Sequence, residues 1–334
     1  MSHDPLAGFP APLGAPPRYE EPEEPIENSV PPQPAKPKLW LHAVLFTLTA
    51  VSMHFTALEN TEAPAGQSKW AFAAYQSVSL LAILLIHELG HYVAARIHRV
   101  PASIPYFLPL PRFSIFGTFG AVISMRDRIR SRRALLDIGA AGPIAGMLVA
   151  LPVLCIGLSR SEIGPNSGHY VQEGQSLLYW LAKRLVIGDI PPGYDVHLHP
   201  MAFAGWGGMF LTMMNLLPWG QLDGGHIAYA LFGERQHRFA RWVRRALLAV
   251  FAYNLITLLV PVLLHRSTQP WYAAVMASLF WLLLYGITGL MGHFFGEDHP
   301  PFEPEKLGLG RQILAAVCLV LFVLLFMPTP FAVY

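Results

Sequence analysis

Long apolar stretches separated by short polar segments dominate the chain from residue 40 onward. A helix needs about 20 apolar residues to cross the hydrocarbon core of a bilayer, and most of these stretches reach that length. One is interrupted by proline and glycine, and the last is short. The pattern predicts an all-α, polytopic membrane protein with about seven transmembrane helices (six to eight). The stretches lie at 40–58, 71–97, 134–158, 201–232, 243–264, 271–292 and 312–327.

The composition agrees with a membrane protein. Of the 334 residues, 53% are hydrophobic and 13% are charged, whereas a soluble globular domain carries about 25% charged residues. The formal net charge is only +2, and the basic residues lie between the apolar stretches, so nothing indicates a nucleic-acid partner. Cys155 and Cys318 lie in separate apolar stretches and are expected to pack as small apolar side chains.

The distribution of arginine indicates the orientation in the membrane. Arginines concentrate in two connecting segments, 96–133 and 233–245, and are sparse in the alternate ones. The positive-inside bias therefore places these two segments and the N-terminus in the cytoplasm, and the C-terminus outside. Attraction to anionic lipid headgroups would favour the same arrangement. The loop 159–200 is then outside, and its part 175–187 resembles an interfacial amphipathic helix.

Residues 1–38 differ from the rest of the chain. They are rich in proline and glutamate with few aromatic residues, and no basic region precedes an apolar core, so we expect no cleavable signal. This composition predicts a disordered cytoplasmic tail. Residues 39–334 form the predicted membrane domain, with a core at 71–232 and accessory helices at 39–58 and 243–327.

The segment between the second and third apolar stretches, PASIPYFLPLPRFSIFGTFGAVISM at 101–125, contains too many prolines for a spanning helix. Apolar residues alternate around Phe116 and Phe119, and the glycines Gly117 and Gly120 lie among them. This alternation is typical of short strands. We therefore expect a membrane-associated, hairpin-like loop here.

Three ionisable side chains interrupt the second stretch near its end. His87, Glu88 and His91 form an H-E-x-x-H motif directly after SLLAILLI. Such side chains are costly within a membrane unless they bind a partner such as a divalent metal ion. His87 and His91 stand four residues apart, so they share one helical face and can reach one ion, while Glu88 is placed to act as a base toward water. A chance match is the alternative, and the position inside a span argues against it.

The interrupted fourth stretch contains the sequence NLLPWGQLDGG at 215–225, in which Asp223 is the only acidic residue of the stretch. Asp223 is expected about 15 Å from the cytoplasmic end of its span, and the H-E-x-x-H motif about 12 Å from its own, so the groups can meet. Asp223 is thus a candidate third ligand, with a helix cap as the alternative. Asn215 can donate to a substrate carbonyl, or alternatively join two helices.

These residues resemble a known family. The motifs HELGH at 87–91 and NLLPWGQLDGG at 215–225 are similar to those of the site-2 protease family of intramembrane zinc metalloproteases. Gly142–Pro143 is similar to the family core, and FGTFGAV at 116–122 is similar to the membrane-associated hairpin of the variant in plastid and cyanobacterial relatives. The sequence departs from the family at Gly146, where many members have asparagine, and no stretch is long enough for a PDZ domain.

The resemblance implies one Zn²⁺ ion per chain, held by His87, His91 and Asp223, with Glu88 as the catalytic base and Asn215 as a catalytic and substrate-binding residue. It implies cleavage of single-pass membrane-protein substrates within the lipid bilayer, in a process of regulated intramembrane proteolysis. We expect the location to be the cytoplasmic membrane of a bacterium.

A helical substrate hides its peptide bonds, so it must become extended before it is cleaved. The hairpin at 102–125 can offer an edge for strand addition, which Gly117 and Gly120 keep clear of side chains. A metal transporter is the rival interpretation, but it would need further ionisable residues along a path outward from Glu88. A catalytically silent scaffold is the third, against which the intact Glu88 argues. The oligomeric state is open.

Overall fold

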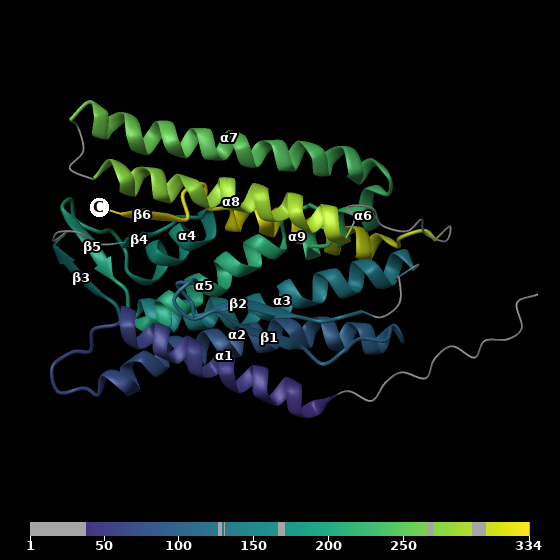
Figure 1. Ribbon diagram of the computed structural model, residues 1–334, viewed down its shortest axis with the longest axis horizontal. Coiled ribbons are helices and arrows are strands. Elements are labelled where there is room, and N and C mark those ends of the chain that lie inside the picture. Colours follow the sequence, from purple (N-terminus) through teal and green to yellow (C-terminus); the bar gives the residue numbers. More distant parts are fainter. Residues whose placement is uncertain are drawn as a thin grey trace, which may run out of the picture. The chain divides into compact units, whose positions relative to one another are not determined.

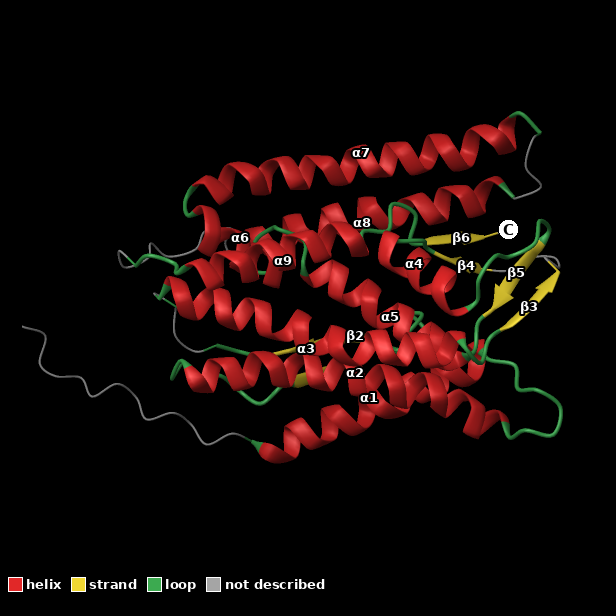
Figure 2. Cartoon of the chain, turned by 180° about the vertical axis from the view of Figure 1, so that it is seen from behind, coloured by secondary structure: helices red, strands yellow, loops and turns green. Residues whose placement is uncertain are grey.

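The computed structural model of the chain describes residues 38–125, 129, 131–165, 171–265, 270–295 and 305–333. Within residues 38–334 the long helices run side by side, with α1 on one flank and α7 on the other, and the short strands β3 to β6 gather at one end (Figures 1 and 2). The helices are α1 Leu39–Asn60, α2 Lys69–Ile97, α3 Arg132–Leu158, α4 Leu177–Val186, α5 Pro200–Asn215, α6 Asp223–Phe232, α7 Arg235–Leu263, α8 Trp271–Phe295 and α9 Leu309–Leu325. The strands are β1 Tyr106–Pro109, β2 Thr118–Val122, β3 Glu162–Pro165, β4 Val171–Glu173, β5 Tyr194–His197 and β6 Phe331–Val333.

Five of the described helices are long and apolar enough to cross a membrane: α1, α2, α3, α7 and α8. The fourth predicted stretch is divided into α5 and α6, because Pro218 and Gly220 interrupt the helix between them. The seventh stretch forms α9, which has 17 residues. The structure therefore confirms a mostly helical, polytopic membrane protein. The predicted tail at 1–38 lies outside the described residues, apart from Lys38.

Small residues bring α2, α3 and α5 close together at the centre of the bundle. A Cβ atom on Gly90 of α2 would lie 2.5 Å from the carbonyl oxygen of Ala141 on α3. A Cβ atom on Gly157 of α3 would lie against the backbone of Ala202 on α5. Close backbone approach of this kind is typical of membrane helices, where van der Waals packing drives association. Pro143 lies inside α3 without ending it.

The predicted hairpin is present as strands β1 and β2, which pair antiparallel with Phe107 opposite Ala121. It is fixed on two sides. The ring of Phe116 packs among aromatic residues of α5, including Trp206. Gly117 has φ of +73° and lies so close to α1 that a Cβ atom there would be 2.7 Å from the carbonyl oxygen of Ser52. The turn of the hairpin therefore packs between α1 and α5.

The sequence did not predict the strands β3 to β6, which lie at one end of the helix bundle (Figure 1). β3 pairs with β5, and β4 pairs with the C-terminal strand β6. The C-terminal segment is also held by hydrogen bonds to the carbonyl oxygen of Pro328 from Asn254 Nδ2 and Trp281 Nε1, both 2.7 Å long. Asn254 thus binds the C-terminal segment rather than another helix.

The helix predicted at 175–187 is α4, which exposes Leu177, Trp180 and Leu185 and buries Lys183. An apolar outer face is what a position at the membrane interface requires. Inward, Lys183 forms an ion pair of 3.2 Å with Glu173. This ion pair joins α4 to β4.

The arginine-rich end of the bundle differs from expectation in one respect. The segment 233–245 is not a loop, because α7 begins at Arg235. Arginine is a good helix former, and nothing in this segment stops a helix. Asp137 does not pair with its neighbours in sequence: it accepts hydrogen bonds from Arg311 (2.7 Å) and lies 2.8 Å from His98 Nε2. Arg132 instead donates to the carbonyl oxygens at the end of α6.

Candidate metal centre

The two histidines of the H-E-x-x-H motif and Asp223 meet at one point inside the bundle. His87 and His91 lie one turn apart on α2, and Asp223 is the first residue of α6. The Nε2 atoms of the histidines are 3.2 Å apart, and each is 3.3 Å from Asp223 Oδ2. The side chains of His87 and Asp223 are only 5% and 15% exposed. The structure thus brings together the three residues that the sequence predicts as a ligand set.

The protonation of His91 shows what this point requires. His91 Nδ1 lies 2.7 Å from the carbonyl oxygen of Ile138. That oxygen can only accept, so Nδ1 carries a proton, and Nε2 presents a lone pair to Asp223 whenever the ring is neutral, as a metal ligand must be. Asp223 Oδ2 is buried and accepts no hydrogen bond within the described residues. Lone pairs and a carboxylate facing each other at 3.3 Å repel unless a cation lies among them.

The spacing suits a tetrahedral ion. Two ligand atoms that are each about 2.05 Å from Zn²⁺ and subtend the tetrahedral angle are about 3.3 Å apart. The observed separations of 3.2 and 3.3 Å agree with this value. Two imidazole nitrogens and one carboxylate oxygen are also the donor set of many zinc sites that perform hydrolysis. The residues present therefore fit a zinc ion.

The break between α5 and α6 delivers Asp223 to this point. Gly220 has φ of +52°, a left-handed conformation that glycine adopts without strain. Gly224 and Gly225 let the start of α6 lie directly on the preceding loop: a Cβ atom on Gly225 would lie against the carbonyl oxygen of Gly220. The Asp223 side chain does not cap α6, because the N-cap residue is Leu222. Capping is therefore not what places an aspartate here.

Two glycines of α3 form the wall behind the histidines. A Cβ atom on Gly142 would lie within 2.5 Å of three ring atoms of His91. A Cβ atom on Gly146 would lie 3.0 Å from His87 Nδ1. Sequence reasoning noted these glycines only as part of a family pattern. Their four-residue spacing, which matches that of His87 and His91, was the signal for their role.

The remaining predicted site residues lie at different places. Glu88 is 5% exposed, and its carboxylate makes no hydrogen bond within the described residues. Asn215 lies at the end of α5, with Nδ2 3.3 Å from His87 Nε2. Gly120 has φ of +103° and open space where a side chain would be. Gly117 finds no such open edge, because α1 fills the space beside it.

One stabilising contact of the centre was not foreseen. Arg132, at the start of α3, donates from Nη2 to the carbonyl oxygen of Leu231 (3.0 Å) and from Nε to that of Ala230 (2.5 Å). These are the free carbonyls at the C-terminal end of α6, where a cation is favourable. Arg132 therefore fixes the far end of the helix that begins with Asp223.

Comparison with known proteins places this centre in a wider context. Residues 75–259, more than half of the chain, match the model of peptidase family M50. The chain is 34% identical over 193 residues to "Probable zinc metalloprotease EGY1, chloroplastic" from Arabidopsis thaliana, and the aligned region covers 55% of this chain and 35% of that protein. It is 30% identical over 237 residues to "Probable zinc metalloprotease EGY2, chloroplastic" from the same plant, covering 64% and 41%. The chain thus spans less than half the length of these relatives.

Proposed function

Because the chain belongs to peptidase family M50, we propose that it is a zinc metalloprotease that cleaves other membrane proteins within or next to their transmembrane segments. One observation carries the proposal: His87, His91 and Asp223 converge at the spacing of zinc ligands, with Glu88 beside them, inside a bundle of membrane helices. Regulated intramembrane proteolysis is the process in which such an enzyme acts.

Each residue has a distinct role in the proposed reaction. His87, His91 and Asp223 hold one zinc ion per chain. The ion, when bound, polarises the scissile carbonyl and lowers the pKa of water. Glu88 is not a ligand and has no hydrogen-bond partner within the described residues, so its carboxylate is free to accept a proton from the attacking water and pass it to the leaving amine.

Asn215 is proposed to bind the substrate carbonyl oxygen. Its amide group lies at the edge of the centre, 3.3 Å from His87 Nε2, and presents hydrogen-bond donors beside the position of the reacting peptide. A donor placed in advance stabilises the negative charge that develops on the carbonyl oxygen.

We propose that an unwound substrate pairs with the hairpin through main-chain hydrogen bonds. Gly120 of β2 supports this, because no atom lies within 4 Å of the position that its Cβ would occupy. Strand addition reads mainly the main chain and so suits substrates of varied sequence. Gly117 has no part in this edge, since it packs against α1.

For the membrane topology we propose two crossings in addition to the five long helices. α5 and α6 together form one, and α9 with the segment that follows it forms the other, which gives seven. The arginine-rich end of the bundle then faces the cytoplasm. The metal centre lies nearer that end, since His91 is six residues before the end of α2, or about 9 Å along the helix.

The test is cleavage by the purified full chain in lipid vesicles that contain a single-pass model substrate. Glu88→Gln is expected to keep zinc and lose cleavage, because the carboxylate acts as a base and not as a ligand. Glu162→Gln, an exposed position on β3, is the matched control and should behave as the wild type. Retained cleavage in Glu88→Gln would overturn the mechanism. Comparison of membrane proteomes with the wild-type and Glu88→Ala chains would then identify natural substrates.

A further inference from the structure

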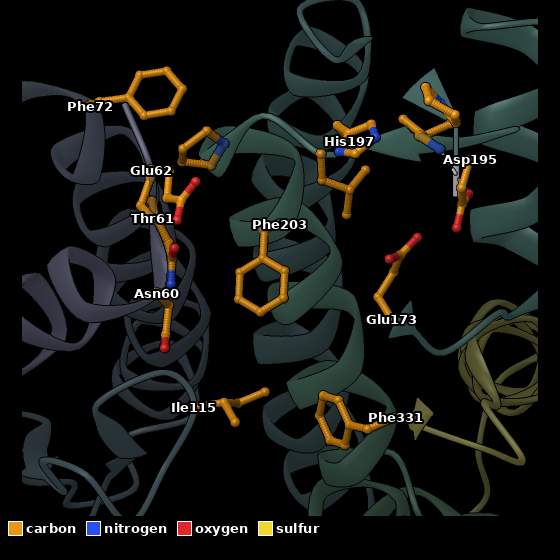
Figure 3. Close-up of a pocket in the computed structure, with 15 residues that line it drawn as sticks. Asn60, Thr61, Glu62, Phe72, Ile115, Glu173, Asp195, His197, Phe203 and Phe331 are labelled. Carbon is orange, nitrogen blue, oxygen red and sulfur yellow. Dashed lines mark hydrogen bonds between the residues drawn. The ribbon is translucent and has the colours of Figure 1, made fainter. Parts of the chain in front are cut away.

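A cavity of about 510 Å³ lies away from the metal centre, among the ends of α1, α2 and α5 and the strands β3 to β6 (Figure 3). Two helices connect it with the centre. On α2, Gln76 lines the cavity and His87 lies eleven residues further along, about 16 Å. On α5, Phe203 lines the cavity and Asn215 lies twelve residues further along, about 18 Å. The cavity is therefore at the opposite end of the helix pair from the arginine-rich segments.

The lining of the cavity is apolar on one side and acidic around it. Phe203, Ile115 and Phe331 lie together, and the carboxylates of Glu62 and Asp195 lie on opposite sides of them (Figure 3). Such a lining fits a ligand with an apolar part next to a positive charge, because carboxylates and aromatic faces both attract cations.

The charges do not cancel within the protein. Among the described residues, three carboxylates line the cavity, those of Glu62, Glu173 and Asp195, and one buried cation, Lys183, pairs with two of them, which leaves a net charge of −2 for these four groups. Tyr179 donates to Glu173 over 2.7 Å. Burial and the charge of Glu173 raise the pKa of Tyr179 well above its usual value, so it remains a neutral donor. Glu62 is exposed and has no ion pair or hydrogen bond within the described residues.

A buried amide also faces the cavity without a partner. Gln76 is 4% exposed and lines the cavity, and its side chain makes no hydrogen bond within the described part of the chain. Buried side-chain amides are nearly always hydrogen-bonded in folded proteins. An amide donates and accepts, which is what the main chain of a bound peptide requires. Gln76 can therefore hydrogen-bond the main chain of a ligand that reaches this part of the cavity.

The hairpin leads from the cavity toward the centre. Ile115, in the hairpin turn, lines the cavity, and β2 begins three residues later at Thr118. A substrate strand that pairs with β2 would therefore continue into the cavity at its outer end. An extended chain advances about 3.3 Å per residue, so about five residues span the 16 to 18 Å between the cavity and the centre.

We propose that this cavity is a recognition site for the segment of the substrate that flanks its transmembrane part. It takes an apolar side chain against Phe203 and a neighbouring lysine or arginine between Glu62 and Asp195, and Gln76 binds the main chain. This proposal rests on the proposed proteolytic function. It makes the sequence outside the membrane, about five residues from the scissile bond, a determinant of substrate choice.

Binding is tested on the full chain carrying Glu88→Gln, so that no cleavage occurs. The probes are two fluorescent peptides that differ only in a lysine or a glutamate next to a leucine. We expect the lysine peptide to bind at least tenfold more tightly. Glu62→Lys should abolish this preference, whereas Glu162→Lys, the same change at an exposed position outside the cavity, should not. Equal binding of both peptides, or displacement of the lysine peptide by an equal concentration of butylamine, would overturn the proposal.

Cleavage gives the second measurement, with single-pass model substrates that carry one lysine at successive distances from the scissile bond. KM should be lowest near a distance of five residues and kcat should change little, because the site binds but does not react. Gln76→Leu should raise KM for that substrate. If the lysine peptide binds but no substrate is cleaved, the proposed function fails and the site stands. If cleavage ignores the lysine and neither peptide binds, the site fails and the function stands.

Discussion

The contact between Gly142 and His91 makes a prediction that can be worked from the structure. In Gly142→Ala the new methyl carbon would lie 2.5 Å from His91 Cδ2 and closer still to Nε2. An ordinary carbon–carbon contact needs about 3.4 Å or more. The ring of His91 or the helix α3 must therefore move by about 0.9 Å to relieve the contact with Cδ2 alone. The ring cannot turn away freely, because its Nδ1 donates to the carbonyl oxygen of Ile138.

This displacement is large compared with what a metal centre tolerates. Ligand distances at a zinc site are held to within about 0.2 Å. Even the loss of a residue that only orients a ligand lowers metal affinity about 10- to 100-fold. We therefore expect Gly142→Ala to bind zinc about 100-fold more weakly or worse. In Gly146→Ala the contact to His87 Nδ1 is 3.0 Å, which a shift of about 0.4 Å relieves, and the expected loss is about tenfold or less.

The assay is competition for zinc between the purified chain and a chelator of known affinity, with elemental analysis of the protein at each chelator concentration. Circular dichroism of each variant checks that the helices are retained. Gly286→Ala is the matched control, since it places a methyl group in open space on α8 and should leave zinc affinity unchanged. Wild-type zinc affinity in Gly142→Ala, or a greater loss in Gly146→Ala, would refute the assigned packing of α3 behind the histidines.

Three further predictions follow from the fold. Arg132→Gln loses the charged hydrogen bonds to the end of α6, each worth about 1.5–3 kcal/mol, and should lower the Tm of the chain in detergent; an unchanged Tm would show that α6 is held otherwise. A cysteine at Ser131 should be protected from impermeant thiol reagents in intact cells and one at Ser167, which lies outside the described residues, should react, while the reverse pattern would mean that the protein is inverted. Gly120→Pro removes the N–H that donates to the hydroxyl of Thr118 and cannot adopt φ of +103°, so cleavage per bound zinc should fall sharply. Ser124→Ala should change it little, and normal turnover by Gly120→Pro would exclude the hairpin from substrate binding.

The metal centre could be predicted because short sequence patterns encode the positions of its residues. The four-residue spacing of His87 and His91 sets their common face, and a single acidic residue in a broken apolar stretch is costly enough to indicate a function. Equal depth in two spans that run in the same direction then placed Asp223 opposite the histidines. The structure confirms this meeting of side chains, while their roles remain predictions.

Other features depend on tertiary contacts that no local pattern encodes. Strands β4 and β6 have three residues each and lie far apart in the sequence, so neither carries a recognisable alternation. The pairing of Asp137 with Arg311 joins α3 to α9 across 174 positions of the sequence. The start of α7 was misplaced because charge marks the membrane boundary and not the end of a helix. Hydropathy therefore locates the apolar stretches but not the bounds of the helices that contain them.

The interruption between α5 and α6 has a consequence for the energetics of metal binding. Two of the proposed ligands are on the long, continuous helix α2, and the third is the first residue of α6, a helix of ten residues that a loop separates from α5. A zinc ion would therefore cross-link α2 to the start of α6. Binding at a concentration 1,000 times the Kd would stabilise the folded state by about 4 kcal/mol. Amide hydrogen exchange at the start of α6 should accordingly report zinc occupancy and become faster after chelation, with a smaller change in α2, where His87 and His91 lie within a helix of 29 residues.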